Sequence, residues 1–426
     1  VPTVAAQMIN MLYNIVDRIY IGHIPGNGSL ALTGVGICMP LIMIISAFAA
    51  LVGNGGAPRA SILMGKGDKA KAEKILGNCF TTQLIISVIL TVVMYFFNRP
   101  MLLAFGASTN TIDYAVSYMN IYAIGTLFVQ LTLGMNTFIT AQGFAKIGMF
   151  SVLIGAVVNI ALDPVFIFAL NMGAAGAALA TIISQAVSGI LCLVRLLLMR
   201  DVLHITWRTL WPTKALLFQL IRLGLPSGLT QAVFSLAMLV VQSLTNSFGT
   251  TIIAVSTVVM RVDGFAMMPN FTFGTATTTF TGQNIGAKRE DRVSEGLKNT
   301  LAIGLLCCAV LGAVTFLFSE ELVSLFGVSG FGLTVGAGYT HFCAPCDLIF
   351  CAYMIINAVI QGAGDVNFTT FNSMSGLLLR CICAYVMAYL TPIGYAGLWV
   401  SVPISWGYSL VLSAFRYRGR KWLTKA

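Results

Sequence analysis

Hydrophobic segments of about 20 residues recur along the whole chain, and this feature restricts the fold more than any other. A segment of that length can cross the hydrocarbon core of a bilayer as an α-helix. Charged residues make up only 9% of the chain, whereas a soluble protein carries charge on about a quarter of its residues. The segments do not show the short alternation of an outer-membrane β-barrel. The sequence therefore predicts an all-α integral membrane protein.

The hydrophobic pattern predicts twelve transmembrane helices joined by short loops. The expected spans are residues 1–24, 30–63, 73–97, 114–142, 146–170, 173–199, 215–248, 252–281, 294–318, 335–361, 367–390 and 394–416. The loops leave no room for a soluble ATP-hydrolysing domain. The segment "MGKGDKAK" also lacks the spacing of a phosphate-binding loop. We therefore expect no cofactor, and no transport driven by ATP on this chain.

Basic residues gather on one side of the predicted topology. Of the 24 Lys and Arg residues, 20 lie in the central linker, at the C-terminus or in loops on that same side. An excess of Lys and Arg marks cytoplasmic loops. We therefore predict a multi-pass protein of the cell membrane with both termini in the cytoplasm. This asymmetry accounts for the net charge of +10, so no nucleic-acid partner is expected.

The two halves of the chain resemble each other. Gly173 pairs with Gly394 and Gly176 with Gly397 at a shift of 221 residues, whereas "GGAPRASILMGKGDK" pairs with "GTATTTFTGQNIGAK" at a shift of 219. Because each half has six spans, both halves enter the membrane in the same sense, as in transporters with parallel repeats. We predict two pseudo-symmetric six-helix lobes around a central cavity. The lobes are residues 1–199 and 215–426, joined by a cytoplasmic linker at residues 200–214.

One pair of intramembrane acids, Asp17 and Asp163, has no counterpart in the second half. The repeat pairs Asp163 of "NIALDP" with Ala384, Asn159 with Arg380, and Asp17 with a position near Val241. Carboxylates inside the membrane are costly and mark functional sites. A purely structural requirement would be expected in both copies. Their restriction to one half indicates a functional specialisation.

Four polar residues of the first half are expected to lie at similar depth: Asp17, Asn159, Asp163 and Thr181. Asn159 and Asp163 are four residues apart and share one helix face. Asp17 ends a stripe of polar residues at helical spacing, which should face a cavity rather than lipid. At ~1.5 Å per residue, each of the three spans places its residue about 8–12 Å from the outer end. Such oxygens suit a small hard cation or a proton. The alternative is a purely structural network of hydrogen bonds between the helices.

Pro164 follows the acid of "NIALDP" directly. Proline has no backbone N–H, so it removes a helix hydrogen bond and should loosen the helix that carries Asp163.

The second half carries both signs of charge within its spans, at Arg261, Asp263, Asp347 and Arg380. Their equal numbers favour internal ion pairs, while a role in substrate binding or ion coupling is the other interpretation. The sequence shows no clustered His, Ser/His/Asp or metal-ligand spacing that would indicate an enzyme.

Three motifs make the chain resemble the multidrug and toxic compound extrusion (MATE) transporters, and within them the prokaryotic MepA-like and DinF-like branch. They are "YNIVDRIYIG", "VVNIALDPVFIF" followed by "MGAAGAALAT", and "GQNIGA". The resemblance covers essentially the whole chain. It implies two six-helix lobes and an antiporter that exports cationic and amphipathic drugs in exchange for Na⁺ or H⁺.

The resemblance also implies roles for particular residues. The coupling ion would be bound by Asp17, Asn159, Asp163 and Thr181. Together with the polar stripe, it implicates Asn10, Tyr13, Asn14 and Asn136 in drug binding and Pro2, with Pro164, in helix bending. We expect a monomer whose partners are small-molecule drugs and the lipid bilayer. The alternative function is a lipid-linked oligosaccharide flippase of the same superfamily, which would use cationic residues such as Arg261 and Arg380.

Overall fold

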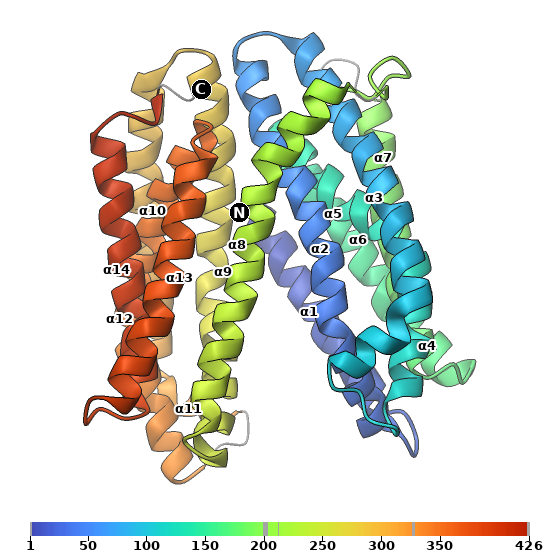
Figure 1. Ribbon diagram of the computed structural model, residues 1–426, viewed down its shortest axis with the longest axis vertical. Helices are drawn as coiled ribbons and strands as arrows, with labels where there is room; N and C mark the ends of the chain where they lie inside the picture. Colours follow the sequence, from blue (N-terminus) through green and yellow to red (C-terminus); the bar gives the residue numbers. More distant parts are fainter. Residues whose placement is uncertain (1, 199–202, 212, 326–328, 424–426) are drawn as a thin grey trace. The chain divides into compact units, whose positions relative to one another are not determined.

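The computed structural model describes residues 2–198, 203–211, 213–325 and 329–423, and within these ranges all regular structure is helical (Figure 1). The helices of the first half are α1 (Pro2–Gly22), α2 (Gly28–Gly65), α3 (Lys69–Ala104), α4 (Ile112–Ile124), α5 (Thr126–Ala141), α6 (Ala145–Pro164), the π-helical turn η1 (Val165–Ala169) and α7 (Ala174–Leu198). The second half contains α8 (Lys214–Asn246), α9 (Thr250–Gly286), α10 (Glu290–Leu317), α11 (Ser319–Ser324), α12 (Phe331–Gly362), α13 (Val366–Tyr389) and α14 (Ala396–Arg418).

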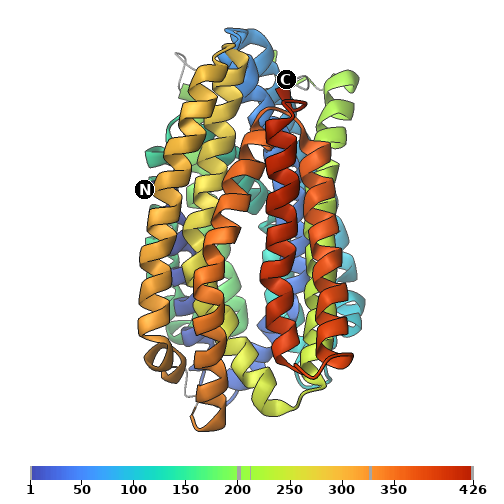
Figure 2. The ribbon, with the colours of Figure 1, turned by 90° about the vertical axis from the view of Figure 1, so that its left-hand side faces the viewer.

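The chain divides into two compact units. The first contains residues 1–64 and 68–228, and the second contains residues 65–67 and 229–426. Within the first unit α6 packs against α1 and α7, and within the second α12 packs against α9, α10 and α14. Figure 2 shows the helices of the second unit side by side.

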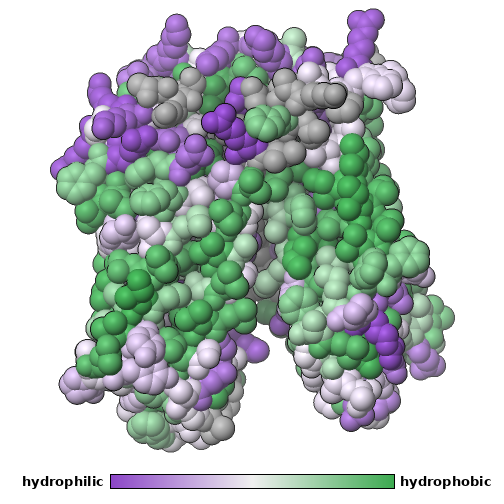
Figure 3. Space-filling view, in the orientation of Figure 1, coloured by the Kyte–Doolittle hydropathy of each residue, from purple (hydrophilic) through white to green (hydrophobic). Residues whose placement is uncertain are grey.

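The helices confirm the predicted membrane-spanning architecture. Among the described residues, nine helices are long and apolar enough to cross a bilayer, or eleven when each of two bent helix pairs counts as one span. The more polar α1 is also of spanning length, at 21 residues. Hydrophobic side chains cover the flanks of both units, as Figure 3 shows, and α3 exposes Val88, Ile89 and Phe96 in this way. Such a surface is stable against lipid rather than water.

Two of the predicted spans are bent, which periodicity alone does not reveal. The span at residues 114–142 breaks at Gly125, where α4 and α5 meet at 58°. An added Cβ at Gly125 would lie 2.3 Å from the side chain of Ile182, so glycine permits the close approach of α7 there. The second bend, of 43°, separates Thr251–Gly264 from Ala266–Gly286. It lies four residues before Pro269, where the proline ring meets the preceding turn.

The internal repeat is visible in equivalent contacts within each unit. Gly155 on α6 lies against Ser188 of α7, and Gly376 on α13 lies against Ser409 of α14. An added Cβ would fall 2.1 Å and 2.4 Å from the respective serine Oγ atoms. Both pairs are related by the predicted shift of 221. The same shift relates the turns of positive φ at Gly143 and Gly364 and at Gly173 and Gly394.

The predicted shift of 219 for the earlier stretch is wrong by two residues. Helix α2 ends at Gly65 and α9 at Gly286, and the following helices begin at Lys69 and Glu290, so the shift is 221 here too. In sequence Gly67 matches Gly286. In structure Gly67 is equivalent to Lys288, and their φ angles are 77° and 56°. The match failed because a lysine occupies a left-handed position that usually holds glycine.

Candidate functional site

Helix α1 supplies the first acid of the site. Asp17 is buried at 7% exposure and Tyr13 at 9%, although the neighbouring Asn14 is exposed. The Asn14 amide donates to the backbone oxygen of Asn10 at 2.6 Å, so these two side chains share one helix face. The Tyr13 hydroxyl accepts a hydrogen bond from Gln185 of α7 at 3.4 Å. The polar stripe thus has a buried end at Asp17 and a more exposed end at Asn10.

Helix α6 supplies the second acid. Asn159 and Asp163 are both fully buried, and the Asn159 amide reaches the Asp163 carboxylate at 3.5 Å, as expected for residues four apart. Gly155, one turn earlier, brings α7 close to this part of the helix. The result is a carboxylate and an amide enclosed by packed helices.

The packing of α1 against α6 brings the two acids together. The charge of Asp17 acts on the carboxylate of Asp163, so the two groups are close enough to interact electrostatically. Tyr20 of α1 and Phe168 of η1 pack edge to face at 6.2 Å, just beyond the acids along both helices. Two negative charges held together away from water repel each other unless a proton or a cation joins them.

Three buried oxygens at this point have no hydrogen-bond partner: Oδ1 of Asp17, Oδ1 of Asn159 and Oδ2 of Asp163. Buried polar groups are almost always hydrogen-bonded, and leaving one unpaired costs about 1–3 kcal/mol. All three atoms are acceptors, so a donor or a positive ion would satisfy them together. Oxygen ligands of this kind fit Na⁺, and a carboxylate oxygen can also hold a proton.

The helix changes its geometry immediately after the second acid. Pro164 ends α6, and the next five residues form η1, where the N–H of Leu170 bonds to the carbonyl of Val165. Turns of this π-type inside helices occur frequently at functional sites. The loosened segment predicted from Pro164 is therefore a specific π-helical turn adjoining Asp163.

Thr181 lies on α7 at the level of the two α6 residues. Gly155 faces Ser188, and Gly176 faces Phe166, which fixes the antiparallel register of α6 and α7. Thr181 falls between these two contacts, beside the turn from Asn159 to Asp163, and is 9% exposed. The register therefore places Thr181 at the same level along the helices as Asn159 and Asp163.

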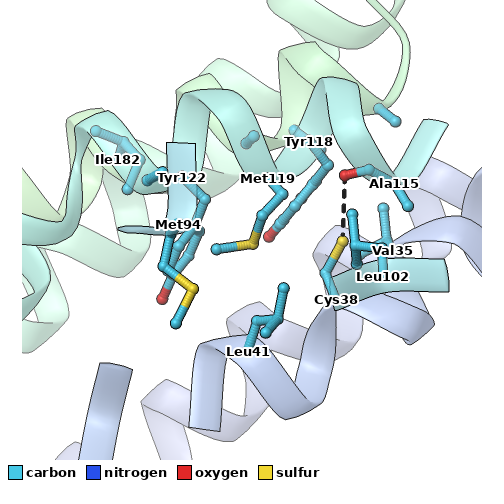
Figure 4. Close-up of a cluster of buried hydrophobic side chains, with 14 of the residues drawn as sticks. Val35, Cys38, Leu41, Met94, Leu102, Ala115, Tyr118, Met119, Tyr122 and Ile182 are labelled. Carbon is cyan, nitrogen blue, oxygen red and sulfur yellow. Dashed lines mark hydrogen bonds between the residues drawn. The ribbon is translucent and has the colours of Figure 1, made fainter. Parts of the chain in front are cut away.

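Two tyrosines of α4 also face the site, and the sequence analysis did not single them out. Tyr118 and Tyr122 stack with ring centroids 6.0 Å apart, and Figure 4 shows both hydroxyls pointing the same way. The charge of Asp17 acts on Tyr118, while Tyr122 interacts with Tyr13. The four-residue spacing in "YMNIY" was the available signal, since it places both rings on one helix face.

Asn136 does not join this group. Its amide donates to the carbonyl of Gly148 at 3.2 Å and to Ser151 at 3.5 Å, so it links α5 to α6. Ser151 precedes Asn159 by about 12 Å along α6, at ~1.5 Å per residue. Of the helix-bending prolines, Pro2 begins α1, but its side chain lies outside the described residues.

The charges of the second unit are arranged differently from the prediction. Arg380 forms no ion pair with Asp263 or Asp347 among the described residues, and its buried Nε has no hydrogen-bond partner. Asp263 instead accepts a hydrogen bond from the hydroxyl of Tyr339 at 2.7 Å. Asp347 is buried at 3% exposure with an unpartnered Oδ1, and Arg261 is exposed. The predicted pairing overlooked Tyr339, because a tyrosine carries no charge to match.

Comparison with known proteins gives consistent matches along the chain. The family model described as MatE matches residues 2–165 and 226–386. The chain is 27% identical to the probable multidrug resistance protein YoeA of Bacillus subtilis over 424 residues, covering 97% of this chain and 90% of that protein. It is 25% identical to the multidrug export protein MepA of Staphylococcus haemolyticus, covering 76% of this chain and 71% of that protein.

Solved structures agree with these matches. One is described as the outward-facing conformation of a multidrug resistance MATE family transporter of the MOP superfamily. It superposes with a TM-score of 0.92 at 25% identity, covering 100% of this chain and 95% of that chain.

Proposed function

Because this chain belongs to the MatE family of multidrug and toxic compound extrusion transporters, we propose that it exports cationic and amphipathic organic compounds in exchange for Na⁺ or H⁺. Relatives named as multidrug resistance and multidrug export proteins support the choice of substrate class. Family membership makes the chain a multi-pass membrane transporter and not an enzyme. The coupling ion, its binding site and the transport cycle are the parts that we propose.

The coupling ion binds between α1, α6 and α7, at Asp17, Asn159, Asp163 and Thr181. The observation that carries this assignment is the set of three buried acceptor oxygens without partners on two packed helices. A Na⁺ ion could be ligated by these oxygens, and a proton on one carboxylate would reduce the repulsion between the acids. One site could therefore accept either ion, and no further cofactor is required.

Ion binding changes the drug-binding surface of the first unit. Neutralising the acids removes their repulsion, so α1 and α6 pack more closely, and η1 provides the adjustable turn beside Asp163. We assign drug contacts to Asn10, Tyr13 and Asn14 on α1, which lie within two turns of Asp17. We propose the same role for Asn136 on α5, whose amide also donates to the carbonyl of Gly148 on α6. An ion arriving from outside would displace the drug outward, and the inward-facing state would release the ion.

The positions of the basic residues support the orientation that we propose. Both termini and the linker at residues 200–214 lie in the cytoplasm, joining lobes at residues 1–199 and 215–426. The transporter acts as a monomer, because each lobe carries its own helix bundle and the ion site lies within a single lobe.

The experiment is efflux of a fluorescent cationic dye from proteoliposomes under separate Na⁺ and H⁺ gradients. Asp163→Asn imitates a permanently neutral acid. It should fold and bind dye, but it should no longer use either gradient for uphill export. Asp17→Asn should behave alike, and the double variant should be little worse than either single variant, because the two acids act as one pair. Thr181→Ala should weaken the cation dependence without abolishing transport.

Asp113→Asn is the matched control, since Asp113 is an exposed acid of the same unit, at the start of α4. It should retain ion-driven efflux. Wild-type coupled efflux from a well-folded Asp163→Asn protein would refute the site and direct attention to Asp263 and Asp347. Absence of dye export by the wild-type protein under both gradients would refute the proposed activity itself.

A further inference from the structure

A small cavity with both polar and apolar lining lies in the second unit, where α8, α9, α12, α13 and α14 meet. Its volume is about 50 Å³. Because about 10–15 Å³ of such space admits one water, the cavity accommodates a group of a few heavy atoms. The polar side chains that line it are Gln242, Thr245, Ser256, Tyr339 and Arg380.

Arg380 supplies an unmatched positive charge to this cavity. A guanidinium carries five N–H donors, no acceptor and a permanent charge. Its Nε is buried without a partner, and the described residues provide no carboxylate within ion-pair distance. Asp263, the acid whose charge acts on Arg380, accepts a hydrogen bond from the Tyr339 hydroxyl at 2.7 Å. A buried charge without a close partner is unfavourable, and an anionic group in the cavity would stabilise it.

The internal repeat places this cavity at the counterpart of the ion-coupling site. Arg380 corresponds to Asn159, and Asp17 corresponds to a position near Val241, which lines the cavity. The register is secured by the equivalent helix contacts of α6 with α7 and of α13 with α14. The first unit therefore presents unpartnered acceptors at this position, and the second presents an unpartnered donor. The two units have opposite polarity at equivalent positions.

We propose that this cavity binds the carboxylate of a zwitterionic organic substrate. A planar carboxylate fits the fork of a guanidinium, and the cavity volume suits a group of that size. The apolar side chains of Met260 and Leu398 and the ring of Trp399 line the same cavity and would contact the organic part of the substrate. The inference rests on the proposed efflux function and names the substrate group that this cavity would hold.

A matched pair of dyes tests the inference in proteoliposomes. The methyl ester of a rhodamine is a cation, and the free acid of the same rhodamine is a zwitterion that differs only in its carboxylate. The wild-type protein should export both. Arg380→Gln should lower export of the acid about tenfold or more, because a charge-assisted hydrogen bond contributes at least one such factor. Export of the ester should stay unchanged.

A second variant keeps the test decisive if Arg380→Gln fails to fold. Gln242→Glu is nearly isosteric and places a carboxylate of the protein itself in the cavity. It should abolish export of the acid, retain export of the ester, and raise the melting temperature of the purified protein. Arg292→Gln removes an exposed arginine of the same unit and should leave the export of both dyes unchanged.

The outcomes separate this inference from the proposed function. Export of the ester but not of the acid by the wild-type protein would overturn the carboxylate site alone. Export of the acid at the wild-type rate by folded Gln242→Glu protein would overturn it as well. Failure to export either dye would instead refute the efflux function on which the inference rests.

Discussion

Substitution of Gly176 by alanine tests whether the packing of α7 against η1 holds the ion site in position. An added Cβ at Gly176 would lie 2.7 Å from the backbone carbonyl carbon and oxygen of Phe166. These are backbone atoms, so no rotamer change can relieve the contact. Restoring the 3.4 Å of an ordinary contact requires a displacement of about 0.7 Å. Overpacking of this kind costs about 1–3 kcal/mol.

The repeat offers a matched control for this substitution. Gly397 occupies the equivalent position in the second unit, and an added Cβ there would lie 2.5 Å from the carbonyl carbon of Met387. Gly397→Ala should therefore destabilise the protein at least as much as Gly176→Ala. Its helix contact, however, adjoins Ala384 rather than an acid. The pair separates a general loss of packing from a specific effect on the ion site.

Two assays distinguish these effects. The melting temperature of each purified variant in detergent should fall for both glycines. Dye efflux as a function of Na⁺ and H⁺ concentration should change for Gly176→Ala alone, because η1 adjoins Asp163. If about 1.4 kcal/mol of the strain appears as weaker ion binding, the half-maximal ion concentration rises about tenfold. Equal changes of ion dependence in both variants, or no loss of stability in either, would refute the reasoning.

Two further predictions concern stability and orientation. Arg416 forms an ion pair with Asp365, and Arg416→Ala should destabilise the second unit by about 3 kcal/mol. This is the lower end of the range for buried pairs, because the Arg416 side chain is 22% exposed. Adding Asp365→Asn to the same chain should partly restore the melting temperature. Single cysteines at the exposed positions Trp207 and Lys288, in a cysteine-free background, should resist membrane-impermeant thiol reagents in intact cells, and strong labelling of either would overturn the orientation.

Much of the fold follows from local features of the sequence. The length of each apolar segment predicted a spanning helix, because a backbone in lipid must satisfy its own hydrogen bonds. The glycines at 173 and 394 predicted equivalent turns, and both have positive φ. The bends at Gly125 and before Pro269 were not predicted. At Gly125 the side chain of Ile182 occupies the space that a Cβ would fill, and only the packing of α7 decides that contact.

The candidate ion site combines local and tertiary information. Helical spacing placed Asn159 and Asp163 on one face, and the cost of carboxylates in lipid singled out Asp17. The sequence could not reveal that Tyr118 interacts with Asp17, or that Tyr122 and Gln185 interact with Tyr13, because α4 and α7 approach α1 only through tertiary packing. It also paired Arg380 with an acid on grounds of charge balance. Only the tertiary structure shows that Tyr339 donates a hydrogen bond to Asp263 and that the guanidinium of Arg380 faces a cavity. The reason is that hydrogen-bond partners depend on distance and direction in space rather than on composition.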